Sequence, residues 1–528
     1  MRAVRSTRVL PAAVAAAALL LAGCSSGGGP SDSSAGSVSG SEGGAAQGRD
    51  ARPLEPLPAA IPADLSSYYA QKLGWQPCDE EFECTTFKVP LDYADPGGGD
   101  MTLSAVRKPA GGGVPAQGSL LLNPGGPGGS AIEYLEGSVN SFDPGLRAAY
   151  NLVGLDPRGV GRSSPVTCLD GPQMDAFTAT DMTPDDQSEI SALVTADKAF
   201  AAGCQKQSGS FLGNVSTVES ARDMDVLRAL LGDDKLHFLG KSYGTFLGAT
   251  YAGLYPSRVG RMVLDGAIDP SLDSLAGNEA QAGGFEIAWS AFAKDCITHD
   301  DCPVGRTEQQ AGEELDALLK RIDAQPLPAE SGRKLTASLA VSGVIQTMYA
   351  EFLWPSLRTA LTAAKAGDGT PLLKLSDSYY QRSPDGSYAN LMFANTAVNC
   401  LDLPAPFADP EAVQKALPTF EKVSPHFGRD MAWMSLSCAY WPRKATGAPH
   451  TIRAAGAPPI VVVGTTRDPA TPYVWAQSLA TQLESGRLLT YDGDGHTAYG
   501  RRNACIDNAV NSYLLGGNAP SAGMRCAK

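Results

Sequence analysis

Residues 235–245 read KLHFLGKSYGT, and this stretch decides how the rest of the chain is interpreted. A short apolar run ends in the pattern Gly-x-Ser-x-Gly, and a segment with many small residues follows it as far as Pro256. The pattern predicts a strand, a sharp turn and a helix, with Ser242 at the tip of the turn. Glycines flank the serine because side chains there would collide with the strand and the helix. Ser242 is therefore the candidate nucleophile.

Strand-like and helix-like segments alternate along the chain around this turn. Apolar runs typical of buried strands occur at residues 119–122, 151–155, 261–264 and 460–463. This alternation predicts a mostly parallel sheet with helices on both faces. Between about residues 270 and 458 the strand pattern stops and helical periodicity takes over. We therefore expect an α/β fold with a largely helical cap inserted between sheet strands.

A chance match to Gly-x-Ser-x-Gly is the alternative in a chain with 58 glycines, so the nucleophile needs a base and an acid elsewhere. His496 follows the last strand-like run through a glycine-rich turn, and Asp468 ends the run before it. Ser242, Asp468 and His496 thus follow the chain order of an α/β-hydrolase triad. The other four histidines lie inside the nucleophile strand or in the helical region: His237, His299, His426 and His450.

Three other aspartates compete with Asp468 for the role of the acid. Asp265 also ends a predicted strand, whereas Asp492 and Asp494 are expected in a turn. We favour Asp468 because, with Ser242 and His496, it satisfies both the chain order and the strand-end context of the triad. Thr471 and the proline after it are interpreted as the N-cap and the first residue of the next helix, with no catalytic role.

An oxyanion hole is expected from residues 123–130, which read NPGGPGGS. Four glycines and two prolines in eight residues exclude a helix or a strand and predict a shaped loop at the end of a strand. The alternative is a plain surface turn. The backbone N–H groups of Tyr243 and Gly126 are the expected donors to the oxyanion.

The N-terminus has the features of an export signal. Arg2, Arg5 and Arg8 precede an apolar run at residues 9–21, which is too short to span a bilayer comfortably. The run ends in Leu-Ala-Gly-Cys, which resembles the bacterial lipobox, so Cys24 is the expected site of lipidation. Acyl chains there would anchor the protein to the outer face of the cell membrane, and release from it is a further outcome. An ordinary signal peptide is the alternative.

These patterns divide the chain into five predicted parts. They are a lipoprotein signal peptide at 1–23, a disordered tether at 24–52, the first part of the α/β core at 53–269, the cap at 270–458, and the second part of the core at 459–528. The tether consists mostly of Ser, Gly and Ala, a composition that buries too little apolar surface to fold.

Cysteine count and charge narrow the chemistry further. Eleven cysteines minus Cys24 leave ten, and an even number in an exported chain indicates disulfides. No Cys-x-x-Cys or histidine cluster predicts a metal, and no cofactor is expected. A net charge of −14 argues against nucleic acid binding, and the sequence does not indicate the oligomeric state. Sequence alone does not fix which of the ten cysteines pair in disulfides. Their spacing and order favour Cys78–Cys84, Cys168–Cys204, Cys296–Cys302, Cys400–Cys438 and Cys505–Cys526.

Five motifs together resemble those of the secreted tripeptidyl aminopeptidases and related envelope proteinases of the prolyl-aminopeptidase family. They are NPGGPGGS (123–130), DPRGVGRS (156–163), GKSYGT (240–245), RDPATP (467–472) and GHT (495–497). The resemblance extends from about residue 70 to the end and places a TAP-like C-terminal region at 459–528. Asn123 departs from the cytoplasmic members, which carry histidine there, so a simple proline iminopeptidase is not expected.

The resemblance implies cleavage of short peptides, with tripeptides expected, from the free N-termini of peptide or small protein substrates. A cap carboxylate would bind the substrate's α-ammonium group, because a neutral amide would leave that carboxylate unpaired. Asp402, beside Cys400, is the first choice for this carboxylate and Glu351 the second. For each, a solvated surface carboxylate is the alternative. An envelope esterase and a non-enzymatic binding lipoprotein are the alternative functions.

Overall fold

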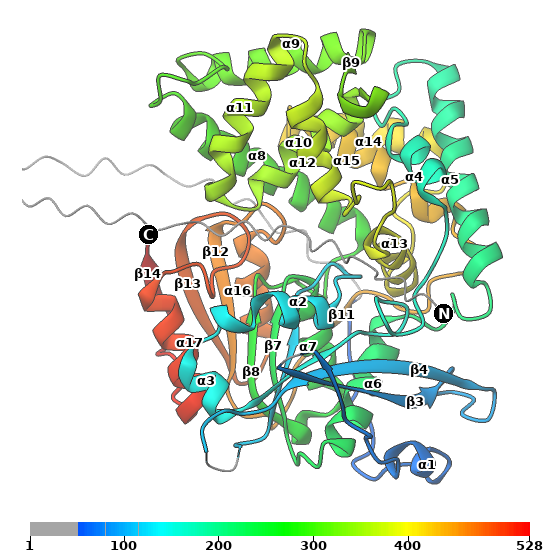
Figure 1. The fold of residues 1–528 in the computed structure, drawn as a ribbon, viewed down its shortest axis with the longest axis vertical. Coiled ribbons are helices and arrows are strands. Elements are labelled where there is room, and N and C mark those ends of the chain that lie inside the picture. Colours follow the sequence, from blue (N-terminus) through cyan, green and yellow to red (C-terminus); the bar gives the residue numbers. More distant parts are fainter. Residues whose placement is uncertain (1–50, 80, 114–115) are drawn as a thin grey trace, which may run out of the picture. The chain divides into compact units, whose positions relative to one another are not determined.

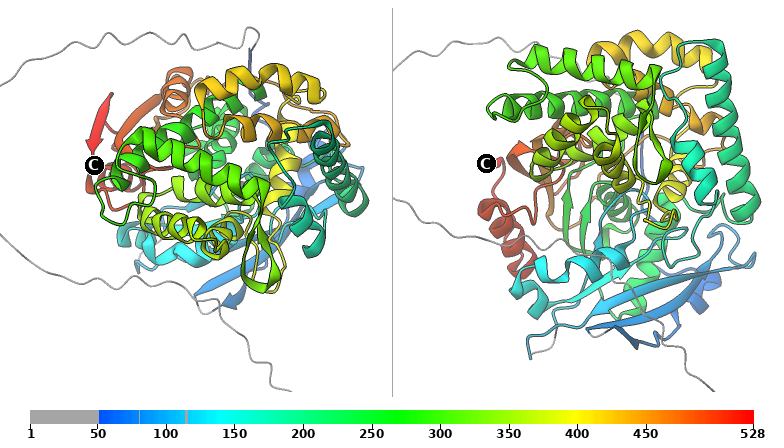
Figure 2. Two further views of the ribbon diagram at one scale, coloured as in Figure 1. Left: turned by 90° about the horizontal axis from the view of Figure 1, so that it is seen from above. Right: turned by 45° about the horizontal axis from the view of Figure 1, so that its top comes forward.

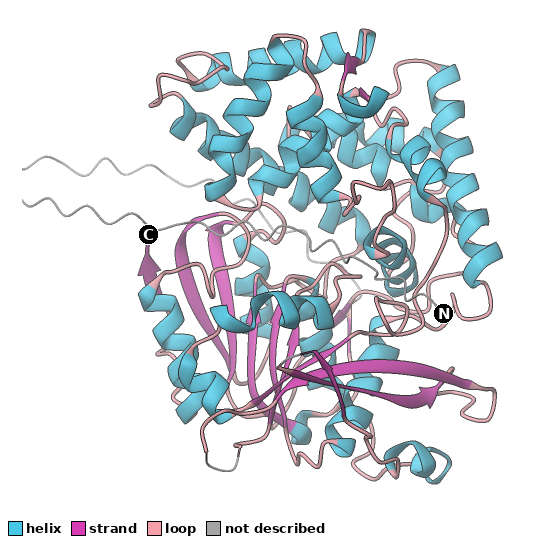
Figure 3. Cartoon of the chain, viewed as in Figure 1, coloured by secondary structure: helices cyan, strands magenta, loops and turns pink. Residues whose placement is uncertain are grey.

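The computed structural model describes residues 51–79, 81–113 and 116–528. Its main feature is a ten-stranded sheet in the order β14-β13-β12-β8-β7-β5-β6-β4-β3-β2 (Figures 1 and 3). The strands from β14 to β6 pair in parallel, and β4, β3 and β2 continue the sheet antiparallel. The strands are β2 (Gln76–Asp79), β3 (Phe82–Pro90), β4 (Asp100–Lys108), β5 (Ser119–Asn123), β6 (Asn151–Leu155), β7 (Leu236–Lys241), β8 (Val259–Asp265), β12 (Ile460–Arg467), β13 (Gly486–Asp494) and β14 (Met524–Ala527).

Helices cover both faces of this sheet, which confirms the predicted fold class. Side chains alternate along β12, so Ile460 and Val462 belong to the apolar cluster that includes residues of α6, α7 and α16, and Val461 and Val463 belong to the cluster that includes residues of α2, α3 and α17. The helices of this part are α1 (Ser66–Tyr69), α2 (Ala131–Ser138), α3 (Pro144–Ala149), α6 (Thr217–Leu230), α7 (Tyr243–Leu254), α16 (Tyr473–Gln482) and α17 (Ala504–Gly516).

A helical layer lies between β8 and β12 in the chain and has its own apolar core. The helical periodicity predicted in this region is confirmed for α9, since its Leu315, Leu318 and Ile322 are all buried. Figure 2 shows this layer over the sheet from two further directions. Its helices are α8 (Ser274–Cys296), α9 (Glu308–Ala324), α10 (Ala337–Met348), α11 (Trp354–Lys365), α12 (Thr370–Tyr379), α13 (Leu391–Asp402), α14 (Pro410–Val423) and α15 (Gly428–Met434).

Two helices that precede the nucleophile in the chain, α4 (Gly171–Thr178) and α5 (Gln187–Ser208), lie beside this layer in Figure 1. Ile190 and Leu193 of α5 share an apolar cluster with Phe420 of α14 and Trp433 of α15. The helical layer therefore also includes helix α5, which comes from the first part of the predicted core. The domain boundaries at 269/270 and 458/459 stay a prediction.

The remaining strands form two small pairs. The strand β1 (Arg52–Pro53) pairs with β11 (His450–Thr451), and β9 (Leu327–Pro328) pairs with β10 (Lys334–Leu335). The first pair joins the beginning of the described chain to the segment that leads back into β12. Among the residues that the structure describes, no helix has the length and apolar character needed to cross a bilayer.

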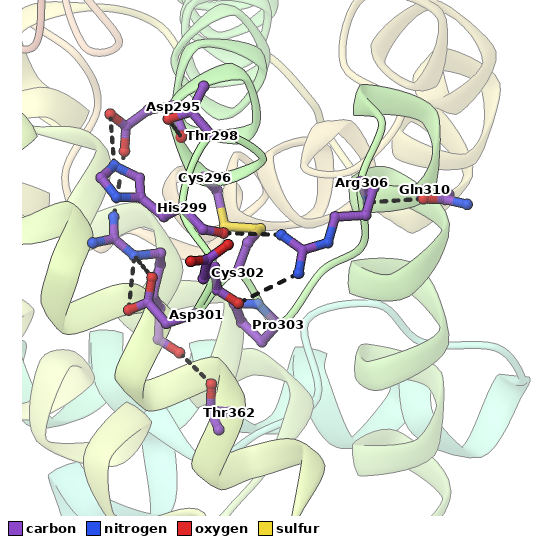
Figure 4. Close-up of a disulfide and its surroundings, with 12 residues drawn as sticks. Asp295, Cys296, Thr298, His299, Asp301, Cys302, Pro303, Arg306, Gln310 and Thr362 are labelled. Atoms are coloured by element: carbon purple, nitrogen blue, oxygen red, sulfur yellow. Dashed lines mark hydrogen bonds and ion pairs between the residues drawn. A yellow bond between two sulfur atoms is a disulfide. The ribbon is translucent and has the colours of Figure 1, made fainter.

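All five disulfides pair as the cysteine order predicted. Figure 4 shows Cys296–Cys302 at the end of α8, where Arg306 donates to the carbonyl of His299 at 3.1 Å. Disulfides persist in oxidising compartments, so these bonds indicate an extracytoplasmic protein. Cys24, the predicted signal peptide and all but the last two residues of the predicted tether lie outside the described residues.

Candidate active site

The predicted nucleophile lies on a strained turn between β7 and α7. Ser242 has φ 55° and ψ −126°, which a residue other than glycine rarely adopts. The flanking glycines make this turn possible. A Cβ at Gly240 would lie 2.3 Å from the carbonyl oxygen of Gly244, and a Cβ at Gly244 would lie 2.8 Å from Oδ1 of Asn123. The N–H of Ser242 donates to the carbonyl of Asp265 at 2.9 Å, which fixes the turn to the neighbouring strand.

The structure brings the predicted acid and base into contact. Nδ1 of His496 lies 2.8 Å from Oδ1 and 3.1 Å from Oδ2 of Asp468. Asp468 is only 2% exposed, and the N–H groups of Ala470, Thr471 and Thr497 donate to its oxygens. These bonds satisfy the buried carboxylate and hold its position. The other ring nitrogen, Nε2 of His496, is buried and has no hydrogen-bond partner among the described residues.

Thr471 does not have the predicted role of N-cap. The helix α16 begins at Tyr473, with Pro472 at the cap position and no side-chain bond to the helix. Oγ1 of Thr471 lies instead 3.3 Å from Nδ1 of His496. The prediction was wrong because the turn around Asp468 continues one residue further than the sequence pattern indicated, and the Thr471 hydroxyl faces the histidine instead of the helix.

Sequence reasoning missed Tyr349, which packs against the candidate base. Its ring meets the His496 ring edge to face, with centroids 5.4 Å apart and an interplanar angle of 87°. Its carbonyl accepts the N–H of His496 at 2.8 Å. Tyr349 directly follows α10 of the helical layer, and an aromatic residue after a helical pattern carries no signal that points to a distant histidine.

The competing aspartates have other partners. The carboxylate of Asp265 accepts the N–H groups of Ala498 and Tyr499. Asp492 is exposed and bonds Thr466, and Asp494 pairs with Arg467. Among the described residues, Asp468 is therefore the carboxylate that bonds the His496 ring.

The other histidines have structural partners as well. His237 accepts the N–H of Arg261, and burial lowers its pKa to about 4. His426 bonds Asp316, His450 bonds the carbonyl of Ala448, and His299 lies 3.5 Å from Asp295.

The glycine loop after β5 lies directly against the nucleophile turn. A Cβ at Gly125 would lie 2.8 Å from Cβ of Ser242 and 3.1 Å from the backbone nitrogen of Tyr243. Gly126 has φ 117°, which a side chain would not tolerate. Tyr243 is the first residue of α7, so its N–H has no acceptor within the helix. The two predicted oxyanion donors thus come from segments in contact, and their role stays a prediction.

Asp402, the first predicted cap carboxylate, lies at the end of α13. It accepts the N–H of Thr217 at 2.8 Å and the hydroxyl of Thr217 at 2.5 Å. The Thr217 hydroxyl also lies 2.6 Å from the Tyr243 hydroxyl. Burial raises the pKa of Asp402 to about 7, although the bonds from Thr217 act in the opposite direction. Its carboxylate therefore already has a partner within the protein.

Glu351, the second predicted cap carboxylate, lies just before α11 and bonds the side chain of Lys528. Burial raises the pKa of Glu351, and the bond from Lys528 opposes the rise. Lys528 also bonds Asp494, which lies two residues before His496. Whether either carboxylate binds substrate stays a prediction.

Comparison with known proteins agrees with this geometry. The family described as "TAP-like protein" matches residues 424–526. The serine protease Hip1 of Mycobacterium tuberculosis is 36% identical over 477 residues, which cover 86% of this chain and 91% of that protein. Tripeptidyl aminopeptidase of Streptomyces lividans is 32% identical over 474 residues, or 86% of each chain. A protein named carboxylesterase B from Mycobacterium tuberculosis is 36% identical over 474 residues, which cover 87% of this chain and 90% of that protein.

These relatives cover 86% to 87% of the chain. Together with the strained Gly-x-Ser-x-Gly turn and the bonded aspartate and histidine, they place the chain in one family. The chain belongs to the TAP-like family of α/β-hydrolases, and it is a serine hydrolase.

Proposed function

We propose that this protein is an exported serine exopeptidase that releases short peptides from free N-termini through an acyl-enzyme on Ser242. The observation that carries the proposal is the contact between His496 and Asp468, which follow the adjacent strands β13 and β12 on one side of the Ser242 strand β7. Tripeptides are the expected products, as in the relative named tripeptidyl aminopeptidase.

In the proposed reaction, Nε2 of His496 takes the proton of the Ser242 hydroxyl as Oγ attacks the carbonyl carbon of the scissile bond. Asp468 accepts the hydrogen bond that Nδ1–H of His496 donates, and this bond keeps the ring oriented. His496 then gives the proton to the leaving amine, and the acyl group stays on Ser242. Water attacks the acyl-enzyme by the same route, with His496 again as the base.

The negative oxygen that forms at each attack would be stabilised by the N–H groups of Tyr243 and Gly126. Donors that are already in position when charge develops lose no energy to reorganisation, and each is typically worth about 3–4 kcal/mol. The contact between Gly125 and Ser242 supports this arrangement, because it holds the glycine loop next to the reacting atom.

An exopeptidase must distinguish a free N-terminus from an internal amide. We propose Asp402 as the anchor for the substrate's α-ammonium group and Glu351 as the second choice. Both lie on the helical layer that also contacts the glycine loop and His496. For either residue to act, the substrate's ammonium group would have to share the carboxylate with Thr217 or replace Lys528. Asp402→Asn should lower turnover of free peptides and leave that of a blocked ester unchanged.

An envelope esterase is the second candidate function, because one relative of similar identity is named carboxylesterase B. The same Ser–His–Asp chemistry cleaves ester bonds and peptide bonds. A comparison of turnover on ester and peptide substrates therefore decides between the esterase and the peptidase. Ester substrates turned over much faster than any peptide would favour the esterase. A non-enzymatic binding lipoprotein is not favoured, since a strained serine in a Gly-x-Ser-x-Gly turn and a bonded His–Asp pair have no use in binding alone.

For localisation, we propose a lipid anchor at Cys24 that holds the enzyme on the outer face of the cell membrane. The lipobox-like sequence and the five disulfides support this. Cys24→Ala should release the protein into the medium. Wild-type protein that is already soluble and begins downstream of residue 24 would exclude the anchor.

The test of the proposed function is a product profile by mass spectrometry. Matched peptides with free and acetylated N-termini are incubated with the wild type and with Ser242→Ala. We expect short N-terminal fragments from the free peptides, none from the acetylated peptides, and no product with the variant. Equal cleavage of free and acetylated peptides would contradict the exopeptidase assignment.

A further inference from the structure

A second buried carboxylate lies between the nucleophile and the acid. Asp265 ends β8, which lies between β7 and β12 in the sheet, and its exposed fraction is 0%. The strand on one side leads into Ser242, and the strand on the other leads into Asp468. A carboxylate is seldom fully buried without a specific set of hydrogen bonds, so the partners of Asp265 indicate what it does.

The main chain around Asp265 bonds both the nucleophile turn and the strand of the acid. Its carbonyl accepts the N–H of Ser242 at 2.9 Å, and the next residue, Gly266, donates to the carbonyl of Val463 at 3.0 Å. Gly266 lies close to the candidate base, since a Cβ there would be 3.2 Å from Cε1 of His496. One short segment therefore contacts the turn of the nucleophile, the strand of the acid and the ring of the base.

The side chain of Asp265 holds the loop that carries the base. Oδ1 accepts the N–H of Ala498 at 2.9 Å, and Oδ2 accepts the N–H of Tyr499 at 2.9 Å. Thr497, with φ 62°, turns these successive N–H groups toward buried acceptors. The N–H of Thr497 itself donates to Asp468 at 3.0 Å. The three amides that follow His496 are thus shared between two carboxylates.

A lysine next to the nucleophile holds the same loop. Nζ of Lys241 donates to the carbonyl of Tyr499 at 2.7 Å, and Lys241 immediately precedes Ser242. Burial raises the pKa of Asp265, whereas Lys241 and the two amides oppose this rise. The loop after His496 is therefore bonded on one side by the side chain before Ser242 and on the other by the residue that accepts the Ser242 amide.

We propose that Asp265 is a positioning residue that aligns the base with the nucleophile, because it bonds the Ser242 turn through its main chain and the His496 loop through its side chain. This inference rests on the proposed function of Ser242 and His496. It differs from a merely structural role, in which Asp265 would satisfy buried amides without setting the rate of proton transfer.

The test is Asp265→Asn, which keeps the size of the side chain but places an NH₂ group opposite one of the two amides. A misalignment of about 1 Å is enough to reduce turnover roughly 100-fold, so we expect kcat per active site to fall by about that factor with KM unchanged. Active sites are counted by titration with a fluorophosphonate, and the second-order rate of that labelling should fall with kcat.

The matched control is Asp233→Asn, because the carboxylate of Asp233 accepts the N–H of Ser119 at 3.1 Å at the opposite end of the sheet. It should leave kcat per titrated site unchanged. A purely structural role for Asp265 predicts fewer titratable sites but an unchanged kcat for each site, and that result would overturn the proposal.

If Asp265→Asn does not fold, Lys241→Met tests the proposal instead, since it removes the bond from Lys241 to the loop after His496. We expect kcat per site to fall about tenfold with KM unchanged, because a charge-assisted hydrogen bond is worth about that factor. Unchanged kcat in Lys241→Met would also overturn the proposal. Peptide turnover retained in Ser242→Ala would instead refute the proposed function, so the two failures are distinguishable.

Discussion

The two sides of the candidate active site are held by different parts of the molecule. On one side, the loop after His496 is bonded by Asp468 and Asp265, both buried at the ends of sheet strands. On the other side, the glycine loop contacts helix α13 of the helical layer. Asn395 donates to the carbonyl of Pro127 at 3.2 Å, and a Cβ at Gly128 would lie 2.5 Å from the carbonyl oxygen of Leu391.

Helix α13 is itself fixed to the core at both ends. At its start, the Asn390 side chain donates to the carbonyl of Gly159 at 2.8 Å and accepts the N–H of Gly161 at 2.9 Å. At its end, Asp402 bonds Thr217, the first residue of α6. The difference teaches that the candidate base depends mainly on the core, whereas the geometry of the glycine loop depends on a cap helix and its anchors.

The largest expected loss comes from the side held by the core. Asp468→Asn removes the acceptor that orients His496, and turnover should fall about 10⁴-fold, as for the equivalent change in a serine protease triad. The measurement is kcat on a peptide with a free N-terminus. Asp492→Asn is the control, because Asp492 is an exposed carboxylate that bonds Thr466, and its replacement should change kcat less than about threefold. Equal losses in the two variants would remove Asp468 from the acid role.

A smaller loss is expected from the side held by the cap. Asn395→Ala removes the bond to Pro127 and should lower kcat about tenfold, part of the value of one oxyanion donor. Thr396→Ala, on the same helix, is the control because the Thr396 hydroxyl bonds the carbonyl of Met392 within the helix. An unchanged kcat in Asn395→Ala would show that the glycine loop keeps its shape without α13.

Loss of the Cys400–Cys438 disulfide should affect stability more than turnover. The bond closes a separation of 38 residues and ties α13 to residues near α15, so replacing both cysteines with alanine should lower the free energy of unfolding by roughly 4 kcal/mol. The Cys296–Cys302 disulfide closes only 6 residues, and its loss should cost roughly 2 kcal/mol. Urea denaturation of the two double variants measures the difference, and a larger loss for the shorter loop would contradict it.

The last prediction concerns the pH dependence of stability at the anchor of α13. Burial raises the pKa of Asp402 from 3.8 to about 7, so the folded protein binds a proton that the unfolded chain releases between these values. The contribution of Asp402 to stability is therefore fully present below about pH 4 and is lost as the pH rises through about 7. Relative to the wild type, Asp402→Asn should become progressively more stable between pH 4 and 7. Parallel stability curves for the two proteins would contradict this.

Local motifs were enough to predict that the candidate serine, aspartate and histidine lie just after strands of the sheet. The positions of Ser242, Asp468 and His496 follow from short patterns, because each needs a strand, a turn and a particular side chain that lie together in the chain. The disulfides were also predictable, since five pairs could be formed from cysteines in chain order. The ten-stranded sheet follows from the same local alternation of strands and helices.

Contacts between distant segments were not predictable from these patterns. Tyr349 reaches His496 from another layer, and α5 joins the cap although it precedes the nucleophile. The prediction of Asp402 rests on its place beside a cysteine, and nothing near it in the chain indicates that Thr217 bonds its carboxylate. Such contacts are set by how the layers pack, and a single sequence carries no local signal for that.

The central claim, that Ser242 is the nucleophile of a triad held mainly by the core, is tested most directly by mapping covalent labelling. The protein is treated with a fluorophosphonate, digested and analysed by mass spectrometry, alongside folded Ser242→Ala. The account predicts a single adduct on Ser242 in the wild type, and neither an adduct nor turnover in the variant. An adduct on another residue, or labelling retained in Ser242→Ala, would contradict it.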